Sequence, residues 1–264
     1  MYETRYHRAN SLAEAAALFT DEARYISGGQ TLIPTMKQRL AAPSDLIDIA
    51  ALPELRGIAA TADGVAVGAA MTHAEVAASD VVRKAIPALA ALAGTIGDPA
   101  VRHMGTIGGS IANNDPAADY PAALLALGAT VHTDRRAIAA ADFFTGLFST
   151  ALEDGEIVVR VEFPAPAKAA YEKFRNPASR YAMAGVFVAV LKDGGIRVAV
   201  TGAGNNGVFR ATAIEEALAR SWSRAAIDTV TIDAGGMLAD IHGSAAYRAN
   251  LVKVMAKRAV MAAG

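Results

Sequence analysis

Apolar and polar residues change period repeatedly along the chain, which predicts short strands interspersed with separate helices. Segments typical of strands lie at residues 23–29, 46–50, 129–133 and 156–164, and the first of these ends in paired glycines. Residues 55–60 and 65–70 are predicted to form a hairpin, because Asp63-Gly64 between them is a strong tight-turn pair. Hairpins mixed with separated helices favour an α+β fold over a doubly wound sheet.

Helix starts are marked by two capping boxes, Ser11 with Glu14 and Thr72 with Glu75. Apolar spacing predicts further helices at residues 31–40, 80–94 and 244–262, one ending at Leu127 and one beginning near Ala211.

The last third of the chain is predicted to form a separate domain. Residues 179–204 read as two long strands that the Asp193-Gly194-Gly195 turn makes antiparallel neighbours. Before these strands, Pro164 and Pro166 break any regular element, so we place a domain boundary at these two prolines.

Composition narrows the classes of function. The chain has 264 residues, is 53% hydrophobic and carries a net charge of −1, without the basic stripe of a nucleic-acid-binding protein. It has no apolar run long enough to span a bilayer, and its N-terminus does not read as a signal peptide, so we expect a cytoplasmic protein.

Cysteine is absent, which excludes disulfides, thiolate nucleophiles and iron–sulfur clusters held by this chain alone. The five histidines are scattered without metal-ligand spacing, so we expect no metal site. Redox chemistry would therefore need an organic cofactor.

One literal dinucleotide fingerprint, Gly202-Ala203-Gly204-Asn205-Asn206-Gly207, lies in the wrong context. Its mechanism requires a parallel strand that leads directly into a helix, whereas the preceding strand here belongs to an antiparallel hairpin. We interpret it as a glycine-rich structural loop and not as a nicotinamide site.

The segment YISGGQTLIPTMKQRL is better placed for anion binding. Gly28 and Gly29 stand where a strand stops and a helix begins, so their uncovered amides and the helix N-terminus would face one point. A diphosphate fits such a place, although a plain strand–helix turn explains the pattern equally well.

The segment TIGGSIANNDPAADYP supplies a second glycine pair, Gly108 and Gly109, which we expect to form another bare-backbone turn. Hydroxyls of Thr106 and Ser110 flank it, and Asp115 and Asp119 follow. Glycine turns for a diphosphate and an acid for ribose or adenine suit a dinucleotide held by two loops, while the alternative makes the two aspartates helix N-caps.

These two segments resemble the flavin-binding motifs of the medium, FAD-binding subunit of molybdenum hydroxylases, the relatives of xanthine dehydrogenase and aerobic carbon monoxide dehydrogenase. FFTGLFSTALEDGEIVVRVEFP also resembles that family, and the resemblance runs from about Tyr6 to near the C-terminus. It implies two FAD-binding lobes of the vanillyl-alcohol-oxidase-like (PCMH) type, residues 1–57 and 58–165. A C-terminal domain, residues 168–264, would contain a three-stranded antiparallel sheet and helices.

Carried over by position, the resemblance implies contacts to FAD. The diphosphate would be held by Ser27, Gly28, Gly29, Gln30 and Thr31 of the first segment and by Thr106, Ile107, Gly108, Gly109 and Ser110 of the second, and Leu32 would also contact the cofactor. Asp119 would bind the adenosine ribose or adenine. Ile96 and Val158 would line the flavin pocket, and Lys173 and Tyr181 would lie close to the cofactor. The segments PASRYA and GAGNNGVFRA depart from the usual wording of the family.

The function so implied is that of an electron-transfer subunit that holds FAD noncovalently. It would take electrons from a small [2Fe–2S] subunit and pass them to an external acceptor. Hydroxylation would occur on a large molybdenum-cofactor subunit, within a dimer of heterotrimers. A self-sufficient flavin oxidase of the vanillyl-alcohol-oxidase-like superfamily is the alternative, and a non-catalytic binding module is a third. The sequence names neither the substrate nor the terminal acceptor.

Overall fold

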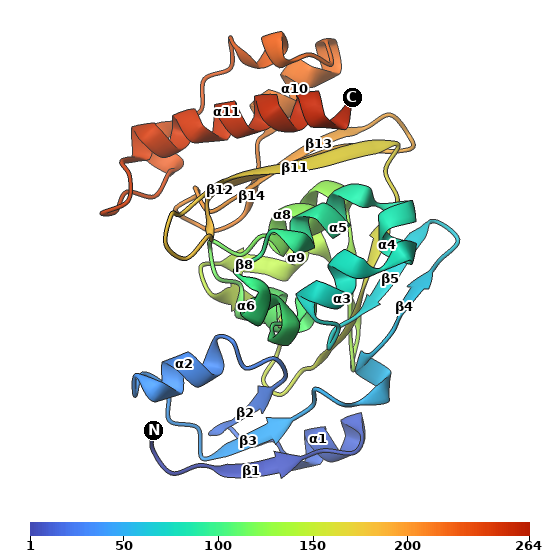
Figure 1. Ribbon diagram of the computed structural model, residues 1–264, viewed down its shortest axis with the longest axis vertical. Coiled ribbons are helices and arrows are strands. Elements are labelled where there is room, and N and C mark those ends of the chain that lie inside the picture. Colours follow the sequence, from blue (N-terminus) through green and yellow to red (C-terminus); the bar gives the residue numbers. More distant parts are fainter.

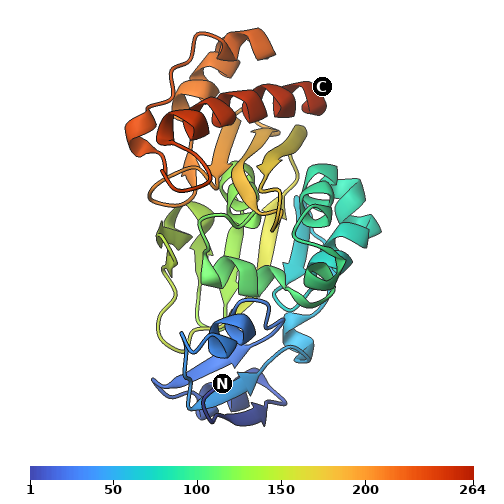
Figure 2. The same cartoon turned by 60° about the vertical axis from the view of Figure 1, so that its left-hand side comes forward.

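A computed structural model describes all 264 residues, which form three tiers stacked along the long axis (Figure 1). The N-terminal tier lies at one end, the middle tier holds most of the short helices, and the C-terminal tier lies at the other end. Figure 2 shows the same order from a second direction.

The N-terminal tier is a small parallel sheet with two helices. Its strands pair in the order β1-β3-β2, and its elements are β1 (Arg5–Arg8), α1 (Leu12–Leu18), β2 (Ala23–Ile26), α2 (Leu32–Lys37) and β3 (Asp45–Asp48). Ser11 caps α1 as predicted, but Glu14 does not close the box, because its carboxylate accepts from the Asn10 amide instead.

The middle tier is a five-stranded sheet covered by short helices. Its strand order is β4-β5-β10-β6-β7, with β4 (Ile58–Ala60), β5 (Gly64–Gly68), β6 (Thr130–Thr133), β7 (Ala137–Ala139) and β10 (Val158–Pro164). Its helices are α3 (His73–Ala78), α4 (Asp80–Ala85), α5 (Pro87–Gly94), α6 (Pro99–Met104), α7 (Ile107–Asn113), α8 (Tyr120–Leu127) and α9 (Ala140–Phe143). A 3-10 turn, Pro53–Leu55, precedes this tier, and the small hairpin β8 (Phe144–Gly146) and β9 (Ser149–Thr150) extends it.

Three predictions for this tier have clear outcomes. The hairpin of β4 and β5 and the complete capping box of Thr72 and Glu75 are confirmed. The single helix expected over residues 80–94 is wrong, because Pro87 cannot continue a helix and the chain leaves helical geometry at Ile86.

The C-terminal sheet has four antiparallel strands, not three. Their order is β11-β12-β13-β14, with β11 (Lys168–Arg175), β12 (Ala182–Val190), β13 (Ile196–Thr201) and β14 (Phe209–Arg210). The additional edge strand β14 has only two residues, too few for a period-2 pattern to reveal it. The remaining elements are α10 (Thr212–Arg220), two 3-10 turns (Arg224–Ile227 and Ala234–Gly236) and α11 (Ala245–Ala263).

Strand β12 is apolar throughout because both faces of this sheet are covered. Val186 and Val188 belong to the core beneath α10 and α11, whereas Phe187 and Ala189 belong to the core of the middle tier. This packing joins the C-terminal sheet to α5 and α8 (Figure 1). The three tiers therefore hold a fixed surface around any ligand that lies between them.

Candidate functional site

A cavity of about 1050 Å³ opens where the three tiers meet. Its wall includes the end of β2 with the following loop, the start of α7, the segment before α8, and parts of the C-terminal tier around Tyr181 and Arg248. The volume lies at the top of the range of about 300–1,000 Å³ for small-molecule sites, so it suits a large ligand.

Of the predicted cofactor residues, most line this cavity. They are Ser27, Gly28, Gly29, Gln30, Thr31, Leu32, Ile96, Thr106, Gly108, Gly109, Ser110, Asp119, Val158 and Tyr181. Ile107 and Lys173 do not: Ile107 is fully buried behind the wall, and the Lys173 side chain is 2% exposed and points to Asp119.

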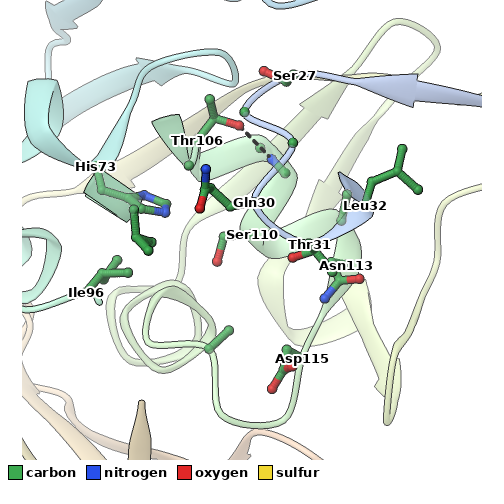
Figure 3. A pocket seen from close by; sticks show the side chains of 18 of the residues that line it. Ser27, Gln30, Thr31, Leu32, His73, Ile96, Thr106, Ser110, Asn113 and Asp115 are labelled. Carbon is green, nitrogen blue, oxygen red and sulfur yellow. Dashed lines mark hydrogen bonds between the residues drawn. The ribbon is translucent and has the colours of Figure 1, made fainter. Parts of the chain in front are cut away.

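The first glycine segment forms the expected link between a strand and a helix (Figure 3). Gly29 has φ +66°, a conformation that glycine adopts without strain. Thr31 begins α2 without a side-chain cap, so amides of the first turn are not covered by that hydroxyl. The buried hydroxyl of Ser27 has no hydrogen-bond partner within the chain.

The second glycine segment is a helix start and not the expected bare turn. Gly108 and Gly109 lie in the first turn of α7, neither has positive φ, and Thr106 caps the helix by accepting from the Gly109 amide at 3.2 Å. Gly108 packs on Ala69, where an added Cβ would lie 2.6 Å from the alanine methyl. The amides from Ile107 to Ser110 are all bonded within the chain, so this segment offers a ligand the hydroxyls of Thr106 and Ser110 and not uncovered amides.

The two glycine segments touch each other through their backbones. A Cβ at Gly28 would lie 2.0 Å from the carbonyl oxygen of Met104, just before the Gly105-Thr106 link to α7. Gly28 therefore permits a close approach between the N-terminal and middle tiers, and this approach brings both glycine segments to one wall of the cavity.

Asp119 is neutralised by the C-terminal tier. Its carboxylate accepts from the Lys173 ammonium at 2.8 Å and from the Tyr171 hydroxyl at 2.5 Å, and its side chain is 5% exposed. Burial, together with the Asp119 charge, raises the pKa of Tyr171 well above its ordinary value. Asp119 occupies the N-cap position of α8 but makes no cap hydrogen bond. Lys173 would thus act on a ligand only through Asp119.

Several wall residues were not among those predicted. Asp115, considered only as a partner of Asp119, lines the cavity and accepts from the Ala117 amide at 2.8 Å. Phe148 projects at the rim with its side chain largely exposed and φ +51°, and its backbone is bonded to Asn114. Phe148 lies in the quoted segment FFTGLFST, but nothing in the pattern of that segment indicates that its side chain lies at the rim of the cavity.

The C-terminal tier adds a buried cation. Arg248 of α11 lines the cavity, donates to the carbonyls of Met183 and Gly202, and pairs with Asp240 at 2.7 Å. An arginine in the first turn of a helix is ordinarily a surface residue, so only the tertiary packing identifies Arg248 as part of the cavity wall.

The fingerprint segment Gly202–Gly207 is a loop, as predicted. It follows β13, which pairs antiparallel with β12, and α10 begins only at Thr212. Gly202 has φ +79°, and an added Cβ would lie 2.1 Å from the Ala182 carbonyl oxygen, so this glycine is required by packing. Gly202 also touches the main cavity, which the sequence did not indicate.

No cluster of three histidine, aspartate or glutamate side chains in the chain has an arrangement that could hold a metal ion. None of the helices combines the length and the apolar character that crossing a membrane would require.

The cavity fits FAD. One wall presents the backbone of residues 28–32 and the unpartnered Ser27 hydroxyl to an anionic group, and much of the remaining wall is apolar. A diphosphate with a planar ring at each end matches these features.

Comparison with known proteins gives the same cofactor. Residues 2–166 match the family described as FAD binding domain in molybdopterin dehydrogenase. The chain is 35% identical to the carbon monoxide dehydrogenase medium chain of Afipia carboxidovorans, over 97% of this chain and 94% of that one. It is 34% identical to the glyceraldehyde dehydrogenase medium chain of Sulfolobus acidocaldarius, over 97% of each.

A solved structure agrees in fold as well as sequence. Carbon monoxide dehydrogenase from Hydrogenophaga pseudoflava superposes with a TM-score of 0.89 at 36% identity, covering 99% of this chain and 97% of that one. The chain therefore belongs to the FAD-binding medium subunits of the molybdenum hydroxylases, the oxidoreductase family of carbon monoxide dehydrogenase and xanthine dehydrogenase.

Proposed function

We propose that this chain passes electrons from [2Fe–2S] clusters on a small partner subunit, through its FAD, to an external acceptor. A bound flavin accepts electrons singly and releases them in pairs, which suits the junction between a one-electron relay and a two-electron acceptor. Substrate hydroxylation would take place at a molybdenum cofactor on a large partner subunit. The assembly would be a dimer of heterotrimers.

The observation that carries this proposal is the meeting of two glycine segments on one cavity enclosed by all three tiers. The diphosphate would be held from Ser27 to Thr31 on one side, by backbone amides and hydroxyls, and from Thr106 to Ser110 on the other, with Leu32 also in contact with the cofactor. Asp119 would receive the ribose or adenine, and Ile96, Val158 and Tyr181 would border the rings.

The ionisable groups of the cavity support a carrier and not a catalyst of substrate chemistry. Asp119 is paired with Lys173, Glu156 with Arg136, and Asp240 with Arg248. The Arg136 guanidinium lowers the pKa of Glu156 to about 2, so this carboxylate stays ionised and bound. No general acid and base stand free side by side.

The partners follow from what this chain lacks and from what its relatives are called. It has no cysteine for an iron–sulfur cluster, so the clusters must be held by another chain. Relatives at 34% and 35% identity are medium chains of dehydrogenases for glyceraldehyde and for carbon monoxide. Similar medium chains thus serve different substrates, which supports a substrate site on the large subunit.

The test is to assemble the complex with this chain either loaded with FAD or stripped of it. With FAD, adding the substrate should bleach both the clusters and the flavin, and the external acceptor should be reduced. Without FAD, the clusters should still bleach while the acceptor stays oxidised. Bleaching of the isolated FAD-loaded chain by the substrate would overturn the relay and favour a self-sufficient flavin oxidase.

A further inference from the structure

His73 is a buried polar side chain in the cavity wall whose hydrogen-bonding capacity the chain leaves unused. The residue is 5% exposed, and its Nδ1 has no partner in the protein. A buried nitrogen without a partner costs about 1–3 kcal/mol, so such atoms are rare unless water or a ligand satisfies them.

The surroundings hold the ring in one place. The backbone amide of His73 donates to the Gly105 carbonyl oxygen, and an added Cβ at Gly105 would lie 2.7 Å from His73 Nε2. On another side the ring lies against Tyr120, with centroids 5.4 Å apart. Figure 3 shows the imidazole directed toward the cavity, which Ile96 and Gln30 also line.

The imidazole is neutral at physiological pH. Burial, assisted by the nearby positive charge of Arg102, lowers the pKa of His73 to about 4. A neutral imidazole offers one donor and one acceptor, so it does not select for an anion and is poorly suited to the diphosphate itself.

We propose that His73 hydrogen-bonds the polar edge of one of the two ring systems of the cofactor. Purine and isoalloxazine edges both carry donors beside acceptors, and Ile96 adds an apolar side chain to the same cavity wall. This deepens the proposed function and rests on it, because it assigns a contact within the FAD site.

The experiment measures FAD affinity of the full chain by quenching of flavin fluorescence, in the wild type and in His73→Leu, His73→Gln and His73→Asn. His103→Leu is the matched control, because His103 is exposed on α6 outside the cavity lining. We expect His73→Leu to weaken FAD binding about tenfold, the effect of one lost hydrogen bond and its unpaired partner. One of the two amide variants should restore most of the FAD affinity. This is His73→Asn if Nδ1 makes the contact and His73→Gln if Nε2 makes it, because each amide places a polar group near the position of that nitrogen.

The melting temperature of the flavin-free protein separates this contact from a structural role. His73→Leu removes a buried unpartnered nitrogen, so the melting temperature without FAD should stay unchanged or rise while the stabilisation by FAD falls. A lower melting temperature without FAD, together with unchanged FAD affinity, would make His73 a packing residue and overturn the proposal. Weak binding by all three variants would reduce its role to shape and also overturn it.

Titration with FMN and with ADP identifies the ring. A loss in His73→Leu that appears with FMN assigns the contact to the isoalloxazine half, and one that appears with ADP assigns it to the adenosine half. Absence of FAD binding in the wild type and the control would defeat the proposed function itself. Equal FAD binding in the wild type and His73→Leu would defeat only the His73 contact.

Discussion

At the scale of the residue, the glycines of the two motifs are required for different physical reasons. Gly29 requires a left-handed backbone, Gly28 and Gly108 allow close packing against Met104 and Ala69, and Gly109 occupies ordinary helical geometry. An added Cβ at Gly109 would meet only the Thr106 hydroxyl, at 3.1 Å. Gly109 is thus the position where we expect the reason for glycine to lie outside the folded chain, in close approach by a ligand.

This difference predicts that Gly28→Ala and Gly109→Ala separate folding from binding. Gly109→Ala should change the free energy of unfolding of the flavin-free protein by no more than about 1 kcal/mol, because alanine favours a helix. FAD affinity should fall, since the methyl group would occupy space at the cavity wall that we expect the diphosphate to enter.

Gly28→Ala should instead destabilise the flavin-free protein by about 1–3 kcal/mol, because two backbones must move apart. Urea titration with and without FAD measures both quantities, with Gly236→Ala as control because nothing lies near its Cβ position. Full FAD affinity in Gly109→Ala would show that no ligand approaches this amide.

At the scale of the element, the start of α8 is tied to strand β11 by a buried ion pair. Asp119 precedes α8, and its partners Lys173 and Tyr171 project from one face of β11 two residues apart. The contact joins the middle and C-terminal tiers beside the cavity.

We expect Lys173→Met to lower the free energy of unfolding by about 3–5 kcal/mol, because it leaves the Asp119 carboxylate buried without its cation. The double change Asp119→Asn with Lys173→Met should recover much of this loss, since no buried charge remains. Urea unfolding of the two single variants and the double variant measures the coupling. Additive losses would mean that the two side chains do not depend on each other.

At the scale of the whole molecule, the cavity exists only because three tiers close around it. The glycine segments belong to the N-terminal and middle tiers, whereas Tyr181 and Arg248 belong to the C-terminal tier. A ligand that fills it must therefore contact all three tiers.

The whole-molecule geometry predicts a preference for FAD over FMN. FMN lacks the adenosine half and one phosphate, so it should bind at least about tenfold more weakly, a difference of about 1.4 kcal/mol. Fluorescence titration of the flavin-free chain with both flavins measures this. Equal affinities would remove the adenosine assignment of Asp119.

Local sequence determined the elements that depend on near neighbours. The Asp63-Gly64 hairpin, the Thr72–Glu75 capping box and the antiparallel pair across Asp193-Gly194-Gly195 form as predicted. The glycine motifs and their resemblance to a family were also sufficient to indicate FAD and the FAD-binding subunit. Each of these signals is carried by residues close together in the chain, so it can be recognised from the sequence alone.

Contacts between distant segments were decided by the tertiary structure alone. The short strand β14 forms because β13 offers it an edge, and Gly108 stands in a helix because Thr106 caps it while Ala69 packs against it. Asp119 pairs with Lys173, which lies 54 residues further along the chain. Arg248 lines the cavity although it belongs to the last helix. Residue type and spacing along the sequence cannot predict such pairings between distant residues. The burial of these side chains and the pairing of their charges arise only when the three tiers pack together.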